Sequence, residues 1–386
     1  MQLRKILSGY WAILLIIVIS GCQSTNVEVP TPKIELKPLE LNASTLFTFN
    51  IQLETALNNT DLVFLENQIS TSLITEKLTK RAPQLFFTSQ QVNKTASQFK
   101  NKIIESVTLF TKEFNWEYLY SETDSQGQVA SYYRLETSEG YNYFTIWLNP
   151  NTFQIFDFHP VSFELSGLNF LISFTSLMSE NSAGDNKQLV DDLLVAVQSQ
   201  NIQEIVKVYK KSEDSISPKG ALDDFVLRSI GQFSANENYT QLIEFIIGNF
   251  EKRGKASLMF EGYYFQNKNF KAAINAVNSI QQFALMDSKM QSELAMLYGY
   301  DNNHTLAAKH ARAAILSNPL DEEAYFVLLQ VAFFSEDHHL ATEVIDVLIA
   351  KFDYIIDTEL ISSLENHQAF LKSDIFATWS NERNQS

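Results

Sequence analysis

The feature that most constrains the fold is a repeat in the last third of the chain. Three windows of 34 residues, which begin at Gly254, Ser288 and Glu322, align without a gap. Only a small group lets one helix nest closely against another, so a small residue at a fixed place indicates paired helices. The small residues at the matching place are Ala273, Ala307 and Ala341. The windows therefore predict stacked helix-turn-helix units.

A period of this length, with a small residue at the start of its second half, resembles the tetratricopeptide repeat. Pro319 stands where that family often ends its second helix. Two weaker units precede the clear ones, at Asn186–Lys219 and Gly220–Arg253. The resemblance implies an all-α helical solenoid over residues 186–355, closed by capping helices over residues 356–386.

The same resemblance implies a groove for a peptide or a partner helix, lined by the inner face of each first helix. The side chains at the matching places are apolar and largely aromatic, which favours an amphipathic helix or a hydrophobic tail as ligand. The alternative is that they are core residues, covered by the neighbouring helix, by the cap or by the amino-terminal domain. These predicted groove residues are Leu258, Phe265, Met296, Tyr300, Phe326, Phe333 and Phe334.

Residues 42–165 change from helical spacing to alternation and predict an α+β domain. Apolar residues first recur at three- and four-residue steps, and turn-forming residues then separate four alternating segments, as expected of an antiparallel meander. Helices followed by a curled meander resemble the cone fold of the nuclear-transport-factor and cystatin-like proteins. The expected strands are Trp116–Glu122, Ser131–Thr137, Tyr141–Asn149 and Gln154–Val161.

Residues 166–185 are expected to connect the two regions. Gly167–Met178 is apolar and rich in phenylalanine, and it is too short to cross a bilayer, so we expect a buried helix. The turn-forming residues 182–185 then indicate a linker.

The amino terminus predicts where the protein resides. Arg4 and Lys5 precede a short apolar run, and Ile19-Ser20-Gly21-Cys22 follows it. This pattern is typical of a signal peptide, residues 1–21, and the last four residues resemble the lipobox of bacterial lipoproteins. The resemblance implies cleavage before Cys22 and its modification by acyl chains such as palmitate. An uncleaved membrane anchor is the alternative.

Residues 22–41 carry three prolines among polar residues and predict an extended, flexible tether. In bacterial lipoproteins, an aspartate directly after the lipidated cysteine directs the protein to the inner membrane. The residue at that place is Gln23, so the resemblance favours the outer membrane, with the protein on its periplasmic side.

Charge narrows the class of partner. The chain has a net charge of −16, and removal of residues 1–21 takes away two cations and no acid, which gives −18. Nucleic-acid binding needs basic clusters that the sequence lacks, and anionic lipid would repel such a surface. Cys22 is the one cysteine, so no internal disulfide can form.

Two groups of residues raise the question of chemistry. Asp157 and His159 lie two apart on an expected strand, on one face with Ile155, and Tyr143 and Trp147 could form an aromatic wall beside them. An acid beside an apolar wall has a raised pKa and can act as a base, but Asp and His are also ordinary residues on the wet face of a strand. These four residues are the alternative ligand pocket of a small-molecule carrier or a modest enzyme.

Histidines could also suggest a metal site. His304 and His338 occupy matching places in consecutive repeats, and His339 is adjacent, but zinc needs three or four convergent ligands and solvated turn histidines explain the pattern as well. No metalloprotease, phosphate-loop, nucleophile-elbow or calcium-loop motif is present. The sequence thus predicts no catalytic residue, metal or cofactor. It predicts a lipid-anchored scaffold that binds proteins of the periplasm or envelope.

Overall fold

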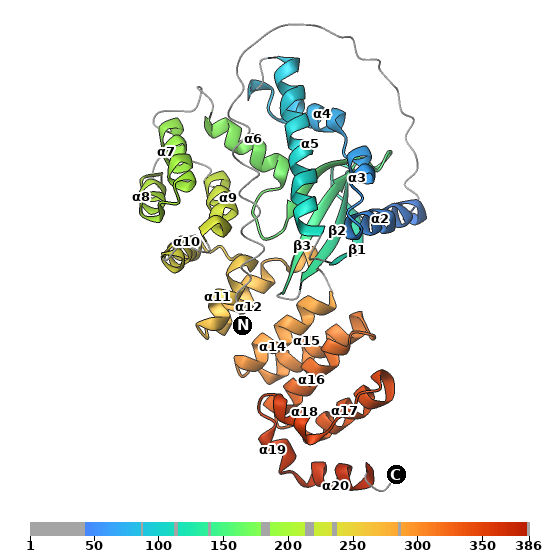
Figure 1. Ribbon diagram of the computed structural model, residues 1–386. Coiled ribbons are helices and arrows are strands. Elements are labelled where there is room, and N and C mark those ends of the chain that lie inside the picture. Colours follow the sequence, from blue (N-terminus) through green and yellow to red (C-terminus); the bar gives the residue numbers. More distant parts are fainter. Residues whose placement is uncertain are drawn as a thin grey trace. The chain divides into compact units, whose positions relative to one another are not determined.

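The computed structural model describes residues 43–85, 88–111, 115–137, 140–178, 186–212, 220–233, 238–284 and 287–383. The predicted signal peptide, Cys22, the tether and the linker at 182–185 lie outside the described residues. The chain divides into two compact units, Met1–Lys255 and Ala256–Ser386 (Figure 1).

The first unit contains one antiparallel sheet in the order β1-β2-β3-β4 (Figure 1). Short turns join its strands, as between β1 and β2, where the Asp124 carboxylate accepts hydrogen bonds of 2.8 Å from the backbone N–H groups of Gln126 and Gln128. The predicted four-stranded meander is confirmed, and each strand ends within two residues of its expected bounds. The strands are β1 (Asn115–Thr123), β2 (Val129–Thr137), β3 (Gly140–Leu148) and β4 (Ile155–Pro160).

One face of the sheet is aromatic and belongs to the core. The ring of Phe144 on β3 lies 4.9 Å from that of Trp116 and 5.0 Å from that of Phe158, between centroids. The side chain of Asn58 on α2 donates to the Trp116 carbonyl at 2.8 Å and accepts from its N–H at 2.7 Å, which fixes α2 on β1. The helices that precede the sheet are α2 (Ala43–Asn58), α3 (Leu62–Gln68), α4 (Thr71–Arg81), the short 3-10 helix η2 (Pro83–Leu85) and α5 (Ser89–Thr111).

Helix α6 (Gly167–Met178) follows the sheet, where a buried helix is expected, and four of its side chains are buried. It begins at a glycine because the chain is crowded there. A Cβ atom on Gly167 would lie 3.0 Å from the Phe99 ring of α5 and 3.1 Å from the Phe158 carbonyl oxygen. Any larger residue would push α6 away from the edge of the sheet.

Two pairs of helices complete the first unit. Helices α7 (Asn186–Gln198) and α8 (Ile202–Ser212) coincide with the first weak window. Helices α9 (Gly220–Ser229) and α10 (Tyr239–Lys252), with the 3-10 helix η3 (Ile230–Phe233) between them, coincide with the second. The region after the sheet is thus mostly helical, as predicted, although the boundary between the compact units lies after α10 and not before α7.

All the regular secondary structure in the described residues of the second unit is helical. Its helices form pairs at the expected spacing. The first helices of two successive pairs, α14 and α16, begin 34 residues apart, and the second helices, α12, α15 and α17, also begin 34 residues apart. The elements are η4 (Leu258–Phe260), α11 (Glu261–Gln266), α12 (Phe270–Asn278), α13 (Gln281–Ala284), α14 (Ser288–Tyr300), α15 (His304–Ser317), α16 (Glu322–Phe334), α17 (His338–Phe352), α18 (Thr358–Ser363), α19 (Gln368–Leu371) and α20 (Asp374–Arg383).

The turn within each pair has the same geometry at each repeat. One residue takes a left-handed conformation, which ends the first helix, and the next side chain caps the second helix by accepting from the N–H three residues on. The left-handed residues are Lys268, Asn302 and Glu336, with φ of 56°, 59° and 53°. The capping residues are Asn269, Asn303 and Asp337.

The first unit contains the same turn, between α7 and α8. Gln200 has a φ of 52°, and Asn201 accepts from the N–H of Glu204 at 3.1 Å. Gln200 precedes Lys268 by 68 residues, which is two periods of 34. This spacing agrees with the 34-residue period, although the same turn also joins α2 to α3, at Thr60 and Asp61, outside the windows.

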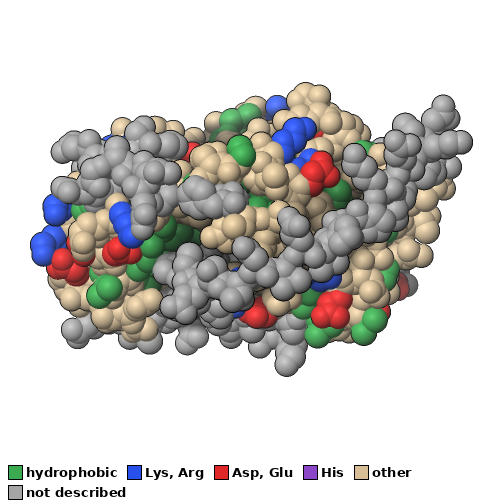
Figure 2. Space-filling model, turned by 90° about the horizontal axis from the view of Figure 1, so that it is seen from above, with side chains coloured by type: hydrophobic (Ala, Val, Ile, Leu, Met, Phe, Trp, Pro, Cys, Tyr) green, Lys and Arg blue, Asp and Glu red, His purple; other side chains and the backbone are tan. Residues whose placement is uncertain are grey.

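The small residues that the sequence singles out lie in the core. Ala273, Ala307 and Ala341 are each 0% exposed, as expected where the second helix of a pair nests against the first. After α17 the helices shorten, and α20 has no buried residue. Within the described part of the chain, no helix is both long and apolar enough to span a membrane. On the face that Figure 2 shows, apolar side chains appear as patches among polar and charged ones.

Candidate functional sites

Three of the predicted groove residues form an aromatic row in the second unit. The Tyr300 ring lies 5.3 Å from that of Phe265 and 5.3 Å from that of Phe334, between centroids. Each comes from the end of the first helix of a successive pair, and each is partly exposed. The row of Phe265, Tyr300 and Phe334 runs across three repeats, and Phe270 stacks on its central member.

The absence of a side chain at Gly299 lets the Phe334 ring pack closely against α14. A Cβ atom on Gly299 would lie 2.7 Å from the Phe334 ring, so any other residue there would displace that ring. Gly299 is on α14 and has no unusual backbone angle, so its role is to allow close contact between two repeats.

The other predicted groove residues differ in burial. Met296 and Phe326 are partly buried, and the Phe326 ring packs edge-on against Tyr354 at 5.0 Å. Leu258 and Phe333 are 2% exposed, so the structure corrects their placement from groove to core. The Phe333 ring is covered by Phe370 of α19, at 5.2 Å between centroids. For Phe333 this agrees with the alternative that the predicted groove residues are core residues covered by the cap.

A polar residue on α16, the helix that carries Phe333, makes a contact that the sequence pattern did not indicate. The Gln330 side chain, 6% exposed, donates to the Glu365 carbonyl at 2.5 Å and accepts from the Glu365 N–H at 3.1 Å. Burial and the influence of the Glu365 carboxylate raise the pKa of the Tyr300 hydroxyl to about 12. The available signal was a lone glutamine in the apolar run of α16.

The strand register brings the four residues of the alternative pocket onto one face of the sheet. Trp147 pairs with Asp157, and Thr145 pairs with His159, while the backbone of Tyr143 bonds to that of Val161. Ile155 does not join them. A β-bulge between β3 and β4 pairs Ile155 with Leu148 and turns its side chain to the opposite face, which corrects the expectation from simple alternation.

Asp157 and His159 are each committed to contacts with the backbone or a hydroxyl group. Asp157 accepts from Ser166 Oγ at 2.6 Å and from the N–H groups of Leu168 and Phe158 at 2.8 Å, so it caps the start of α6. Burial raises the pKa of Asp157 to about 6, although these hydrogen bonds favour its charged form. His159 Nε2 lies 3.0 Å from the Phe163 carbonyl oxygen, and burial lowers its pKa to about 4. These contacts tie Asp157 to the start of α6 and His159 to the loop after β4.

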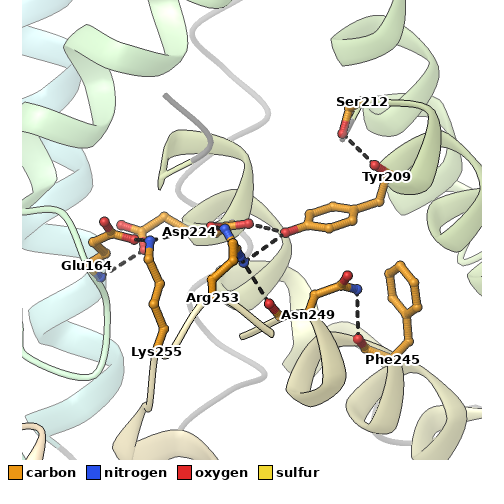
Figure 3. Close-up of polar contacts among 9 residues, drawn as sticks. Glu164, Tyr209, Ser212, Asp224, Phe245, Asn249, Arg253 and Lys255 are labelled. Carbon is orange, nitrogen blue, oxygen red and sulfur yellow. Dashed lines mark hydrogen bonds and ion pairs between the residues drawn. The ribbon is translucent and has the colours of Figure 1, made fainter. Parts of the chain in front are cut away.

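A buried ionic cluster, absent from the sequence predictions, joins α9 to the loop that follows β4. Asp224 is 0% exposed and accepts from the N–H groups of Glu164 and Leu165 at 2.9 and 2.8 Å (Figure 3). Arg228, one helical turn later, donates to the Leu165 carbonyl at 2.9 Å and pairs with Asp224 at 3.5 Å. Burial raises the pKa of Asp224 and lowers that of Arg228, while their mutual attraction opposes both shifts.

The neighbouring acid extends this cluster to α8 and α10. Asp223 accepts from the Tyr209 hydroxyl and pairs with Arg253, and Lys255 pairs with Glu164 at 2.5 Å (Figure 3). Burial and the charge of Asp223 raise the pKa of Tyr209. The one sequence signal was the pair Asp223-Asp224 with Arg228 four residues on, inside an otherwise apolar helix. The cluster has a structural role, because its bonds attach α8–α10 to the loop beside the sheet.

The histidines do not gather into a metal site. Among the described residues, no three His, Cys, Asp or Glu side chains come together as metal ligands would. His304 and His338 are each the first residue of a helix, α15 and α17, and the His338 ring packs against Phe370 at 5.9 Å.

In comparisons with protein-family models, curated proteins and solved structures, nothing matches this chain. The resemblances to a lipobox, to tetratricopeptide repeats and to a cone fold therefore stay predictions from the sequence.

Proposed function

We propose that this protein is a lipoprotein, anchored in the outer membrane and facing the periplasm, which acts as a scaffold for other proteins through a solenoid of tetratricopeptide-like repeats. The observation that carries the repeat part is the recurrence of one turn geometry. A left-handed residue followed by a capping Asn or Asp recurs at Lys268, Asn302 and Glu336, at the period of that family. Such stacks present extended surfaces that bind partner proteins.

The aromatic row supports a partner of apolar character. Phe265, Tyr300 and Phe334 are partly exposed, and each successive repeat contributes one of them. Aromatic side chains dominate the energetics of many protein interfaces because they bury a large area with few rotatable bonds. A partner helix with an apolar stripe fits a row of this kind.

The anchor would supply the second half of the mechanism. Acylation of Cys22 confines the repeats to one membrane surface, which raises their effective concentration toward partners held at the same surface. Three acyl chains give a lasting attachment, at about 0.8 kcal/mol for each buried methylene. The test is growth with labelled palmitate. The label is expected on the wild-type chain and absent from Cys22→Ala, and an unlabelled wild-type chain would contradict the anchor.

The scaffold role is tested by capture of partners from intact envelopes. Wild-type protein is expected to copurify with a specific protein that is lost from the double variant Phe265→Ala with Phe334→Ala. The matched control is Arg312→Ala, which changes an exposed residue on α15. If the double variant is folded and keeps the same partners as the control, the aromatic row is not the binding surface.

A further inference from the structure

The outward side of helix α2 is uncharged and carries two exposed apolar side chains. Phe47 and Ile51 are 56% and 38% exposed, and they share one face of the helix because they lie four residues apart. Every exposed side chain of α2 is neutral, in a chain whose net charge is −16. The neutral face, as we name it here, consists of Ser44, Phe47, Thr48, Ile51, Gln52 and Thr55.

The one charged residue of α2 is used on the side that meets the sheet. The Glu54 carboxylate accepts a hydrogen bond of 2.7 Å from the backbone N–H of Tyr118 on β1. Asn58, one turn later, bonds to both the N–H and the carbonyl of Trp116. Because β1 is an edge strand, these contacts place α2 along the open edge of the sheet (Figure 1). They also fix which side of the helix remains exposed.

The threonines of the neutral face have hydrogen-bond acceptors within the helix. Thr48 Oγ1 donates to the Ser44 carbonyl at 2.9 Å, and Thr55 Oγ1 donates to the Ile51 carbonyl at 2.8 Å. Removing a hydroxyl group from water is costly when no protein group replaces the lost hydrogen bond. Since both hydroxyl groups already have an acceptor, the neutral face can leave water at a lower cost than a charged face.

The neutral face also lies close along the chain to the predicted lipid site. Residues 23–42 separate Cys22 from α2, and a flexible chain of twenty residues spans on the order of 25 Å. At this distance even a weakly apolar face would meet the bilayer at a high effective concentration. Anionic lipid repels an acidic surface, so an uncharged face is the one that can approach the membrane.

We propose that the neutral face of α2 rests on the lipid surface that holds the acyl chains, with Phe47 and Ile51 at the boundary between headgroups and hydrocarbon. This inference rests on the lipid anchor proposed above and adds a defined contact to it. The acyl chains supply the attachment, and the neutral face determines which side of α2 touches lipid. Amphipathic surfaces of this kind enter the boundary by about 5 to 10 Å.

The test uses the acylated mature chain in vesicles of phosphatidylethanolamine and phosphatidylglycerol, with and without bromine on the acyl chains. Cys22 is the only cysteine, and acylation would consume its thiol, so Ile51→Cys offers one free thiol to a fluorophore. Brominated lipid is expected to quench that fluorophore at least ~2-fold, because it lies at the depth of the acyl boundary. Val195→Cys is the matched control, since Val195 on α7 is apolar and 64% exposed, and its fluorophore should keep its emission. Equal quenching at the two positions, or none at either, overturns the proposal.

A second set of variants tests whether the apolar side chains make the contact. The fluorophore is moved to Thr48→Cys, between the two apolar residues. Phe47→Asp with Ile51→Asp should abolish its quenching, because charged groups do not enter the boundary, whereas Phe47→Leu with Ile51→Leu should preserve it. Quenching that survives both aspartates would contradict the proposal. So would emission that depends on protein concentration and not on bromine, which would assign the face to a second copy of the chain.

The wild-type chain distinguishes a failure of this contact from a failure of the anchor. It should take up no fluorophore, because its single thiol is acylated. Fluorophore on the wild type would mean that Cys22 is free, and would remove both the anchor and the contact that depends on it. An unlabelled wild type together with an unquenched fluorophore at position 51 would leave the anchor in place and contradict the contact alone.

Discussion

Buried charges hold together the helices beside the sheet in the first unit, whereas alanines do so in the second. Asp224 and Arg228 of α9 are almost completely buried and form hydrogen bonds with the backbone of Glu164 and Leu165. In the second unit Ala307 and Ala341, each 0% exposed, lie in a hydrophobic cluster at the helix crossings.

The two solutions differ in how they depend on single residues. A charge taken out of water needs its partner, so the ionic junction fails when one member is lost. Helix pairs built on small residues tolerate change gradually, because neighbouring repeats bury one another through many contacts of similar strength. The first unit is thus specified by a few particular residues, and the second by a pattern.

The largest effect is expected from Asp224→Ala. Removal of this carboxylate leaves the buried guanidinium of Arg228 without its counter-charge and two backbone N–H groups without an acceptor, at a cost of about 3 to 5 kcal/mol in the free energy of unfolding. Urea unfolding measures it, with the exposed Glu66→Ala as control. The double variant with Arg228→Met should lose less than the two single losses combined. A loss for Asp224→Ala no larger than that of the control would break the contrast between the units.

Acid should weaken the first unit through His159. Its pKa is about 4 when folded and about 6.5 when unfolded, so stability is fully present above pH 6.5 and is lost as the pH falls toward 4. The loss attributable to this group is on the order of 3 kcal/mol. Asp157, with a pKa raised to about 6, acts in the opposite sense and adds stability as the pH falls below 6.

The contribution of His159 is therefore measured as a difference between two chains. The stability of the wild type relative to His159→Gln, which retains a donor toward the Phe163 carbonyl, should decline between pH 7 and pH 4. A difference that does not change with pH would contradict the assignment.

Overpacking should distinguish the alanines at helix crossings from other alanines on the same helix. Ala341→Leu forces three extra carbons into a site with no exposed surface and should cost about 1 to 3 kcal/mol. Ala350→Leu changes an exposed position on the same helix, α17, and should cost little. Equal costs for the two variants, measured by thermal unfolding, would mean that Ala341 does not set the spacing of the helices.

The smallest effect concerns the repeated turn. Asn303→Ala and Asp337→Ala each remove one side-chain bond to the start of a second helix, which costs about 1 kcal/mol. Because the two turns are equivalent, the losses of unfolding free energy should be similar. A loss confined to one of them would show that the turns are not energetically equivalent.

The sequence predicted the elements that follow a period. Alternation located the four strands, and the 34-residue period located α12 and α14–α17, because in both cases a repeated side-chain spacing reflects a repeated contact. The bulge at Phe156 was not predicted, since alternation assumes a regular ladder, and it moves Ile155 to the other face.

The candidate sites were predicted less completely, for a physical reason. Phe265, Tyr300 and Phe334 follow from the repeat and do meet in a row. The burial of Phe333 depends on Phe370, and the role of Asp224 depends on a loop sixty residues earlier in the chain. Contacts between segments so far apart leave no local pattern in the sequence.

The central claim is that the aromatic row binds a protein partner at the membrane surface, and photo-crosslinking in living cells tests it most directly. A crosslinking amino acid placed at Phe334 should yield a defined adduct with one or a few envelope proteins, while the same group at the exposed Arg312 should not. Identical adducts from both positions, or no adduct from the row, would contradict the account.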